Sequence, residues 1–321
     1  MTLDSLFDAI AAAHQAIRPQ ARVTPLEHSP ALSALTGCEV YLKCEHLQRT
    51  GSFKFRGASN KLRLLEPAAR RDGVIAASTG NHGQSVALAG SLLQVPVTVY
   101  APASAATVKL DAIRALGAEL KLVDGDALAA ELSAGEAARR AGLPFVSPYN
   151  DLEVVAGQGT VGMELAEQCP ELDAVFVSVG GGGLISGIGA ALRRLAPAAE
   201  MVGCWPSAAA TMHASLQAGR IVEVDEGDTL SDGTAGGVEP GAVTFELCQA
   251  LIRHCALVSE AEIRAALRLL AQNERWMVEG AAGVALAGLL QQAPRYHGKK
   301  VAVLLCGRNI VLDKFLGAVT A

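Results

Sequence analysis

A lysine flanked by two aromatic residues is the first feature that could do chemistry. Lys54 lies between Phe53 and Phe55 in the hexapeptide SFKFRG (52–57). Aromatic neighbours keep water away from an ammonium group, which lowers its pKa and makes the amine a plausible Schiff-base nucleophile. An ordinary surface lysine packed along aromatic side chains would show the same pattern, and the hexapeptide alone favours that simpler interpretation.

A run of four glycines, Gly180 to Gly183, follows directly after the apolar run 174–179. Consecutive glycines let backbone N–H groups converge without Cβ atoms in the way, and the start of the following helix favours an anion. The dinucleotide pattern G-x-G-x-x-G fails because Ser186 stands in its last position, and no Gly-Lys-Ser/Thr follows. We therefore expect a site for one small phosphate; the alternative is a tight strand-to-helix turn.

Two further segments place polar residues after apolar runs. Ser78, Thr79, Asn81 and His82 come just after the run 74–77, where hydroxyls and backbone amides could hold an anionic ligand at a helix start. A simple helix cap by Ser78 or Thr79 explains the same residues equally well. Cys306 ends the run 301–305, and its thiol either packs in the core or faces a ligand.

The elements that must position these residues alternate along the chain. Helical patterns span 83–93, 105–116, 126–141 and 260–273, and apolar runs typical of buried parallel strands span 74–77, 97–100, 120–123, 143–146, 174–179 and 301–305. This alternation predicts an α/β fold with parallel sheets flanked by helices. We expect a small α/β domain over 73–150 and a large discontinuous domain formed by 1–66 and 151–321.

Composition excludes several classes of protein. The 321 residues carry 27 Lys+Arg and 32 Asp+Glu, a net charge of −5, which argues against a nucleic-acid partner. The apolar runs are shorter than the ~20 residues of a membrane-spanning helix, and the first ten residues lack the basic segment of a secretory signal. Seven cysteines without C-x-x-C spacing indicate reduced thiols and a cytoplasmic location.

The order of these segments resembles the fold-type II pyridoxal-phosphate enzymes, a group that includes the tryptophan synthase β-chain. Within that group, the lysine hexapeptide, the S-x-G-N-H-G segment (78–83), the glycine loop and the L-C-G-R-N end (305–309) are similar to the serine/threonine dehydratase family. The resemblance covers nearly the whole chain, including 149–151 and 157–160. It implies pyridoxal 5'-phosphate as the cofactor, a small amino acid as the substrate and a homodimer.

The resemblance also implies a role for each site residue. Lys54 would bind the cofactor covalently and remove the α-proton of the substrate, and Cys306 would face the pyridine nitrogen as a neutral partner. The implied cofactor-binding residues are Phe53, Lys54, Asn81, Gly180, Gly181, Gly182, Gly183, Leu184 and Cys306. The implied substrate-binding residues are Ser78, Thr79, Asn81 and His82.

Departures from the family pattern refine the expected reaction. Thr79 replaces the serine that racemases of this branch use, which argues against racemisation. Trp205 and Thr211 replace the carboxylates of a cation site, so we expect no metal. Arg308 replaces a small residue, and its guanidinium would either pair with a polar substrate tail or lie on the surface. The chain also ends too soon after Asn309 for a C-terminal regulatory domain, which we do not expect.

These features predict β-elimination of a β-hydroxy amino acid to a 2-oxo acid and ammonia. The segments 78–83, 229–239 and 305–310 most resemble the threonine dehydratase-like enzymes of hydroxyectoine utilisation. Dehydration of serine, threonine or hydroxyaspartate and amino-acid racemisation are the alternatives within the cofactor class. Outside that class, a non-catalytic α/β protein that binds a phosphometabolite would keep the glycine loop, but would have no use for Lys54.

Overall fold

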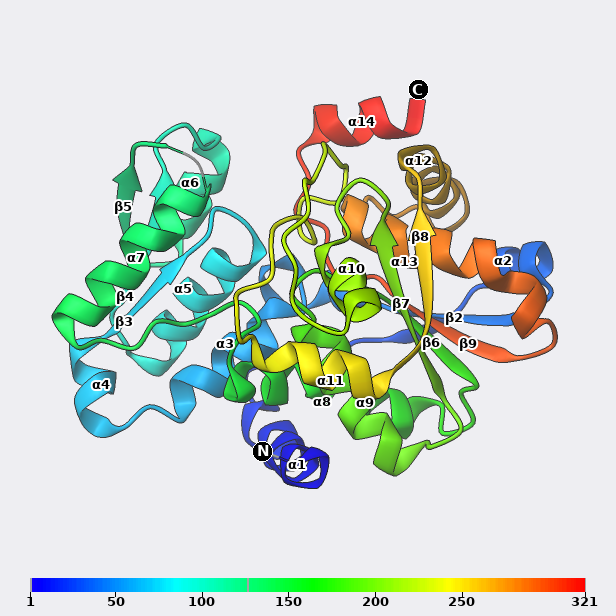
Figure 1. The fold of residues 1–321 in the computed structure, drawn as a ribbon, viewed down its shortest axis with the longest axis horizontal. Helices are drawn as coiled ribbons and strands as arrows, with labels where there is room; N and C mark the ends of the chain where they lie inside the picture. The colour runs from blue at the N-terminus through cyan, green and yellow to red at the C-terminus, as the bar shows by residue number, and fades with distance from the viewer. Residues whose placement is uncertain (1, 126, 321) are drawn as a thin grey trace.

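The computed structural model describes residues 2–125 and 127–320, and the strands in these residues form two sheets (Figure 1). The larger sheet has the order β1-β2-β9-β6-β7-β8. Its strands are β1 (Leu26–His28), β2 (Glu39–Lys43), β6 (Ala174–Ser178), β7 (Glu200–Pro206), β8 (Ile252–Val258) and β9 (Lys300–Leu304). The smaller sheet has the order β3-β4-β5 and consists of β3 (Val74–Ala77), β4 (Val97–Pro102) and β5 (Glu119–Val123).

The helices surround these sheets and lie between them. They are α1 (Leu3–Ile17), α2 (Pro30–Thr36), α3 (Lys54–Arg63), α4 (Pro67–Asp72), α5 (Asn81–Leu93), α6 (Thr107–Ala115), α7 (Ala127–Ala141), α8 (Leu152–Gln168), α9 (Gly183–Leu195), α10 (Thr211–Ala218), α11 (Val243–Leu251), α12 (Glu260–Leu269), α13 (Gly280–Gln292) and α14 (Leu312–Thr320). Short turns of helix are η1 (Glu45–Leu47), η2 (Arg49–Gly51), η3 (Leu270–Glu274) and η4 (Ala293–Tyr296). No helix in the described residues is long and apolar enough to cross a membrane.

The predicted α/β fold with parallel sheets flanked by helices is confirmed, with three differences in detail. β1 pairs antiparallel with β2, so the larger sheet is mixed. The run 143–146 forms one isolated bridge, between Phe145 and Ile75, rather than a strand. The helix expected over 260–273 changes at Leu270 into the π-helical turn η3. Asp126, the first residue of the expected helix 126–141, lies outside the described residues.

Burial explains why the strands form where they do. Every residue of β6 is buried, and so are Val301 to Leu304 of β9, because helices cover both faces of the sheet. Helix α9 packs against β6 and β7, and α13 packs against β6, β7, β8 and β9. A separate apolar core joins the smaller sheet to α3 and α5, and Figure 1 shows this smaller unit at one end of the molecule.

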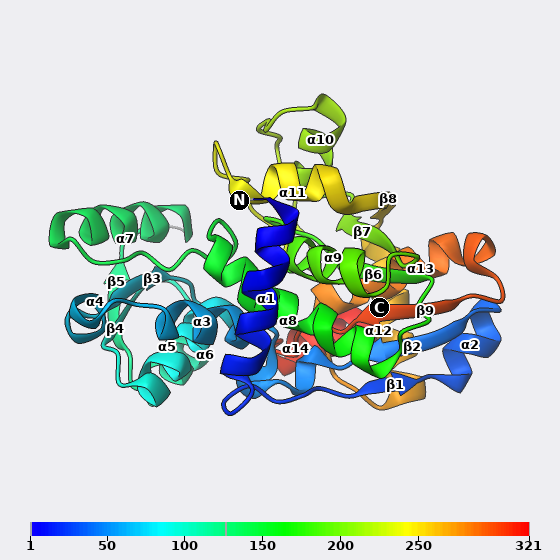
Figure 2. The same ribbon diagram turned by 90° about the horizontal axis from the view of Figure 1, so that it is seen from below.

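Helices between the two sheets hold them in place. Helix α3 packs against both α5 and α8, and α1 crosses α8 and α9, as the view from below shows (Figure 2). The segments that precede four helices converge on the space between the sheets: α3 begins at Lys54, α5 at Asn81, α9 at Gly183 and α13 at Gly280. Strand carboxyl ends and helix amino ends therefore meet at one place, the usual position of a ligand in α/β proteins.

Candidate active site

A cavity of ≈ 980 Å³ lies at this junction and is lined by residues of both sheets. All of the sequence-predicted site residues line it, although they are spread over more than 250 positions of the chain. They are Phe53, Lys54, Ser78, Thr79, Asn81, His82, Gly180, Gly181, Gly182, Gly183, Leu184 and Cys306. The four sequence segments thus belong to one site.

The amine of Lys54, the candidate reactive group, lies in the cavity lining. Its Nζ donates a hydrogen bond to the carbonyl oxygen of Pro148 at 2.8 Å. Because the surrounding protein keeps water from the amine, the pKa of Lys54 falls from 10.5 to about 8, although Cys306 and Glu279 act in the opposite direction. Only Phe53 contributes an aromatic face, 5.2 Å from Nζ, since Phe55 is buried in the core of the smaller sheet.

The glycine loop tolerates no side chain where it lines the cavity. A Cβ atom on Gly181 would lie 2.3 Å from the Tyr149 ring. Gly182 has φ +87°, and a Cβ there would lie 2.5 Å from the Cys248 sulfur. The loop leads directly into α9, so backbone N–H groups at a helix start face the cavity. This arrangement suits a phosphate group.

A carboxylate that the sequence analysis missed lies beside the predicted cofactor residues. Both oxygens of Glu279 accept hydrogen bonds from Asn81 Nδ2, at 3.0 and 2.9 Å, and Oε1 also accepts from the Cys306 thiol at 3.6 Å. Asn309 Nδ2 donates to Asn81 Oδ1 at 2.5 Å, which fixes the orientation of that carboxamide. The only sequence signal for Glu279 was a single charge next to the apolar segment 280–290.

Burial shifts the pKa values of Glu279 and Cys306 in the same direction. It raises the pKa of the Glu279 carboxyl and raises the pKa of the Cys306 thiol well above its ordinary value, where the nearby Glu279 adds to the effect. Ser178 Oγ donates to the Cys306 sulfur at 3.7 Å. Cys306 is therefore a neutral thiol at the end of β9, with its sulfur in the cavity lining.

The loop 78–82 enters the cavity at the amino end of α5. Gly80, rather than Ser78 or Thr79, is the residue that precedes the helix, and no side chain caps it. His82 Nε2 donates to Val146 O at 2.7 Å, while Nδ1 is buried without a partner. Burial and the nearby Lys54 lower the pKa of His82 to about 3, so its ring is neutral.

Three residues singled out as departures lie away from the cavity. Trp205 is buried in the core of the larger sheet, and Thr211 donates to Glu226 Oε1 at 2.5 Å. In the described residues, no group of three or more His, Cys, Asp or Glu side chains could hold a metal ion. Arg308 is exposed and lies beside Gly51, outside the cavity lining.

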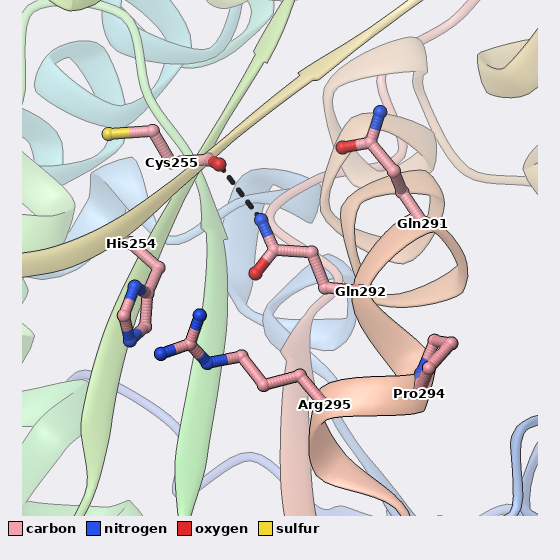
Figure 3. Close-up of a pocket in the computed structure, with 6 residues that line it drawn as sticks. All are labelled: His254, Cys255, Gln291, Gln292, Pro294 and Arg295. Atoms are coloured by element: carbon pink, nitrogen blue, oxygen red, sulfur yellow. Dashed lines mark hydrogen bonds between the residues drawn. The ribbon is translucent and has the colours of Figure 1, made fainter.

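A second, shallower pocket of ≈ 340 Å³ lies at the edge strand β8 (Figure 3). Gln292 Nε2 donates to Cys255 O at 2.8 Å, and Gln291 Nε2 donates to Leu257 O at 3.0 Å. These side chains donate hydrogen bonds to carbonyl groups at the open edge of the sheet, which protects that edge from pairing with another strand. The pocket has no group comparable to Lys54.

The fold and the site together define a pyridoxal-phosphate enzyme. The family model described as "Pyridoxal-phosphate dependent enzyme" matches residues 17–307, and the chain belongs to this family. Pyridoxal phosphate is therefore its cofactor, and its curated relatives place it among the lyases of the threonine dehydratase type.

Two relatives and one solved structure illustrate the similarity. The L-threonine ammonia-lyase of Thermotoga maritima is 42% identical over 290 residues, which are 89% of this chain and 71% of the relative. The L-threo-3-hydroxyaspartate ammonia-lyase of a Pseudomonas species is 38% identical over 315 residues, 98% of each chain. The processed form of threonine deaminase isoform 2 from Solanum lycopersicum has a TM-score of 0.94 at 35% identity, covering 100% of this chain and 94% of that one.

The residues around the cavity fit pyridoxal phosphate. A lysine whose pKa is about 8 can form an imine with the cofactor's aldehyde near neutral pH. The glycine loop suits one phosphate, and the neutral Cys306 suits a ring nitrogen that needs no strong acid beside it. The Asn81 carboxamide, held by Glu279 and Asn309, can present its second N–H to a ring hydroxyl.

Proposed function

We propose that this enzyme removes water from a β-hydroxy amino acid and yields a 2-oxo acid and ammonium. Lys54 carries the proposal, because its amine lines the cavity, has a pKa of about 8 and lies next to a loop suited to a phosphate. The printed names of its relatives, L-threonine ammonia-lyase and L-threo-3-hydroxyaspartate ammonia-lyase, support the same class of reaction.

Each group of the site has a part in this reaction. Pyridoxal phosphate, when bound, would supply an electrophilic aldehyde for the substrate's amino group and a ring that makes the α-hydrogen acidic. Lys54 Nζ then takes up the α-proton, which its low pKa permits. The glycine loop and the start of α9 bind the phosphate, and the loop 78–82 at the start of α5 binds the substrate carboxylate.

Cys306 and the buried surroundings direct the outcome. A neutral thiol cannot stabilise positive charge on the ring nitrogen as a carboxylate would, so negative charge at the α-carbon is short-lived and the β-hydroxyl leaves. Loss of water across the Cα–Cβ bond gives an enamine, which tautomerises to an imine. Water hydrolyses this imine to the 2-oxo acid and ammonium.

The screen should include substrates whose side chains differ in charge, because the cavity lining contains both basic and acidic residues. Lys109, Arg139 and Lys314 line it, and so do Glu131, Glu136 and Glu239. A screen for 2-oxo-acid release would therefore compare L-threonine, L-serine, L-threo-3-hydroxyaspartate and the hydroxylated diamino acid expected from hydroxyectoine. Use of the last compound would support the proposed place in hydroxyectoine utilisation.

Covalent trapping tests the assignment of Lys54. Borohydride reduction of the holoenzyme followed by peptide mapping should place the cofactor label on Lys54, and Lys54→Ala should release no 2-oxo acid. A label on another lysine, or 2-oxo-acid release by Lys54→Ala, would contradict the proposal.

Racemisation is a second activity that the site can be tested for. The Thr79 hydroxyl lines the cavity in the loop proposed to bind substrate, but it carries an extra methyl group compared with serine. We expect the substrate recovered from a partial reaction to keep its configuration in chiral analysis, and Thr79→Ser to increase any inversion.

We further propose a homodimer in the cytoplasm that needs no nucleic acid, membrane or metal. All seven cysteines are free thiols, which fits a reducing compartment. Light scattering on the purified protein would test the dimer, with a monomeric mass as the contradicting result.

A further inference from the structure

Helix α11 lies behind the glycine loop, on the side away from the cavity. Thr244 Oγ1, which is buried, donates to Gly181 O at 2.6 Å. One turn later, the Cys248 thiol donates to Gly182 O at 3.9 Å. Gly181 and Gly182 line the cavity, whereas Thr244 and Cys248 do not. The loop is thus held from the rear by two successive carbonyl groups.

The geometry of the peptide bond links the direction of each carbonyl to the direction of the next backbone N–H. In a trans peptide, the carbonyl oxygen of one residue and the N–H of the next point in opposite directions. Because Thr244 draws the Gly181 oxygen toward α11, the N–H of Gly182 points away from α11 and toward the cavity. The Gly182 oxygen accepts from Ser186 N at 3.0 Å, so α9 itself orients the N–H of Gly183, and the contact with Cys248 is secondary.

Without the Thr244 contact, the peptide between Gly181 and Gly182 has little to hold it. Glycine has no Cβ and adopts positive and negative φ with similar ease, so a peptide unit between glycines can rotate. A buried carbonyl that has lost its partner gains by rotating toward another donor. That rotation would turn the N–H away from the cavity.

We propose that Thr244 is a positioning residue that aims the backbone amides of the glycine loop at the cofactor's phosphate. The inference rests on the proposed function, since it takes this loop as the phosphate site. Thr244 then sets the affinity for the phosphate group but has no effect on binding of the pyridine ring. A merely structural threonine would lower stability without this selectivity.

Two ligands and three variants separate these possibilities. The full-length protein is stripped of cofactor and titrated with pyridoxal 5'-phosphate and, separately, with pyridoxal, which lacks the phosphate. Thr244→Val keeps the shape and removes the hydroxyl, whereas Thr244→Ser keeps the hydroxyl. Thr36→Val is the matched control, because the buried Thr36 hydroxyl also donates to a backbone carbonyl, Leu32 O, at 2.8 Å.

We expect Thr244→Val to raise the Kd for pyridoxal phosphate about tenfold, the usual effect of weakening a hydrogen bond to a charged group. The Kd for pyridoxal should stay unchanged, Thr244→Ser should behave as wild type, and Thr36→Val should alter neither ligand. The phosphorus NMR shift of bound cofactor should move only in Thr244→Val. If that variant does not fold, Thr244→Ala, which also removes the hydroxyl, should show the same selective loss.

An equal loss for both ligands, or no loss in a folded Thr244→Val or Thr244→Ala, would overturn the inference. Such a result would leave the proposed function intact, provided that wild type still binds pyridoxal phosphate. Failure of the wild-type chain to bind pyridoxal phosphate would instead refute the proposed function and, with it, this inference.

Discussion

The burial of Lys54 predicts a specific pH dependence for the reaction of its amine with an aldehyde. Only the unprotonated amine attacks an aldehyde, so the rate of imine formation rises with pH until the amine is fully unprotonated. Burial lowers the pKa of Lys54 from 10.5 to about 8. The rate should therefore reach half its maximum near pH 8 rather than above pH 10.

The size of the effect follows from the two pKa values. At a pH of about 7.5, an amine with a pKa of about 8 is unprotonated in roughly one molecule in four. A lysine with its ordinary pKa of 10.5 is unprotonated in about one molecule in a thousand at that pH. Lys54 should thus react about two hundred times faster than a solvated lysine of equal access.

Stopped-flow mixing of the cofactor-free protein with pyridoxal phosphate measures this rate across pH 6 to 11. Borohydride quenching at each pH shows which lysine has reacted, and Lys299, an exposed residue far from the cavity, serves as the internal comparison. A midpoint above pH 10 for Lys54, or labelling of Lys54 no faster than of Lys299 at pH 7.5, would refute the desolvation argument.

Three further predictions concern Arg56, Gly181 and Arg308. Arg56→Met should lower the free energy of unfolding in urea by about 3–5 kcal/mol, because the buried carboxylates of Glu45 and Glu164 lose a shared cation; a loss no greater than that of Arg63→Met would contradict this. Gly181→Ala should abolish pyridoxal-phosphate binding measured by absorbance, since the new methyl group meets the Tyr149 ring. Arg308→Ala should leave the ratio of kcat/KM for L-threonine and L-threo-3-hydroxyaspartate unchanged; a selective loss for the acidic substrate would show that Arg308 reaches it.

Much of the fold could be predicted from local patterns, and the failures have physical causes. Strands β3, β4, β5, β6 and β9 were predicted because helices bury both of their faces or alternate regularly with them. Strands β1, β2, β7 and β8 were missed. β8 lies at the edge of the sheet, and its sequence IRHCALV mixes charge with apolar residues. Leu143 to Val146 has strand-like composition, but it forms a single bridge, in which Pro144 O and Val146 N both hydrogen-bond to Ile75.

Some residues of the candidate site could likewise be predicted from local sequence patterns, and others could not. Lys54, the glycine loop and the segment 78–83 are visible in sequence because their chemistry depends on residues adjacent in the chain. Glu279 and Thr244 are not, because each acts on groups far away in sequence: Glu279 on Asn81 and Cys306, Thr244 on the Gly181 carbonyl. No spacing rule links such positions.

The sequence by itself determined the class of fold and singled out Lys54 and the glycine loop as candidates, since the short-range order of residue types encodes all three. The tertiary structure decided which charges reach the cavity. It placed Arg308 outside, brought Glu279 in beside Cys306, and set Thr244 behind the loop. It also placed Lys54 where burial lowers the pKa of its amine.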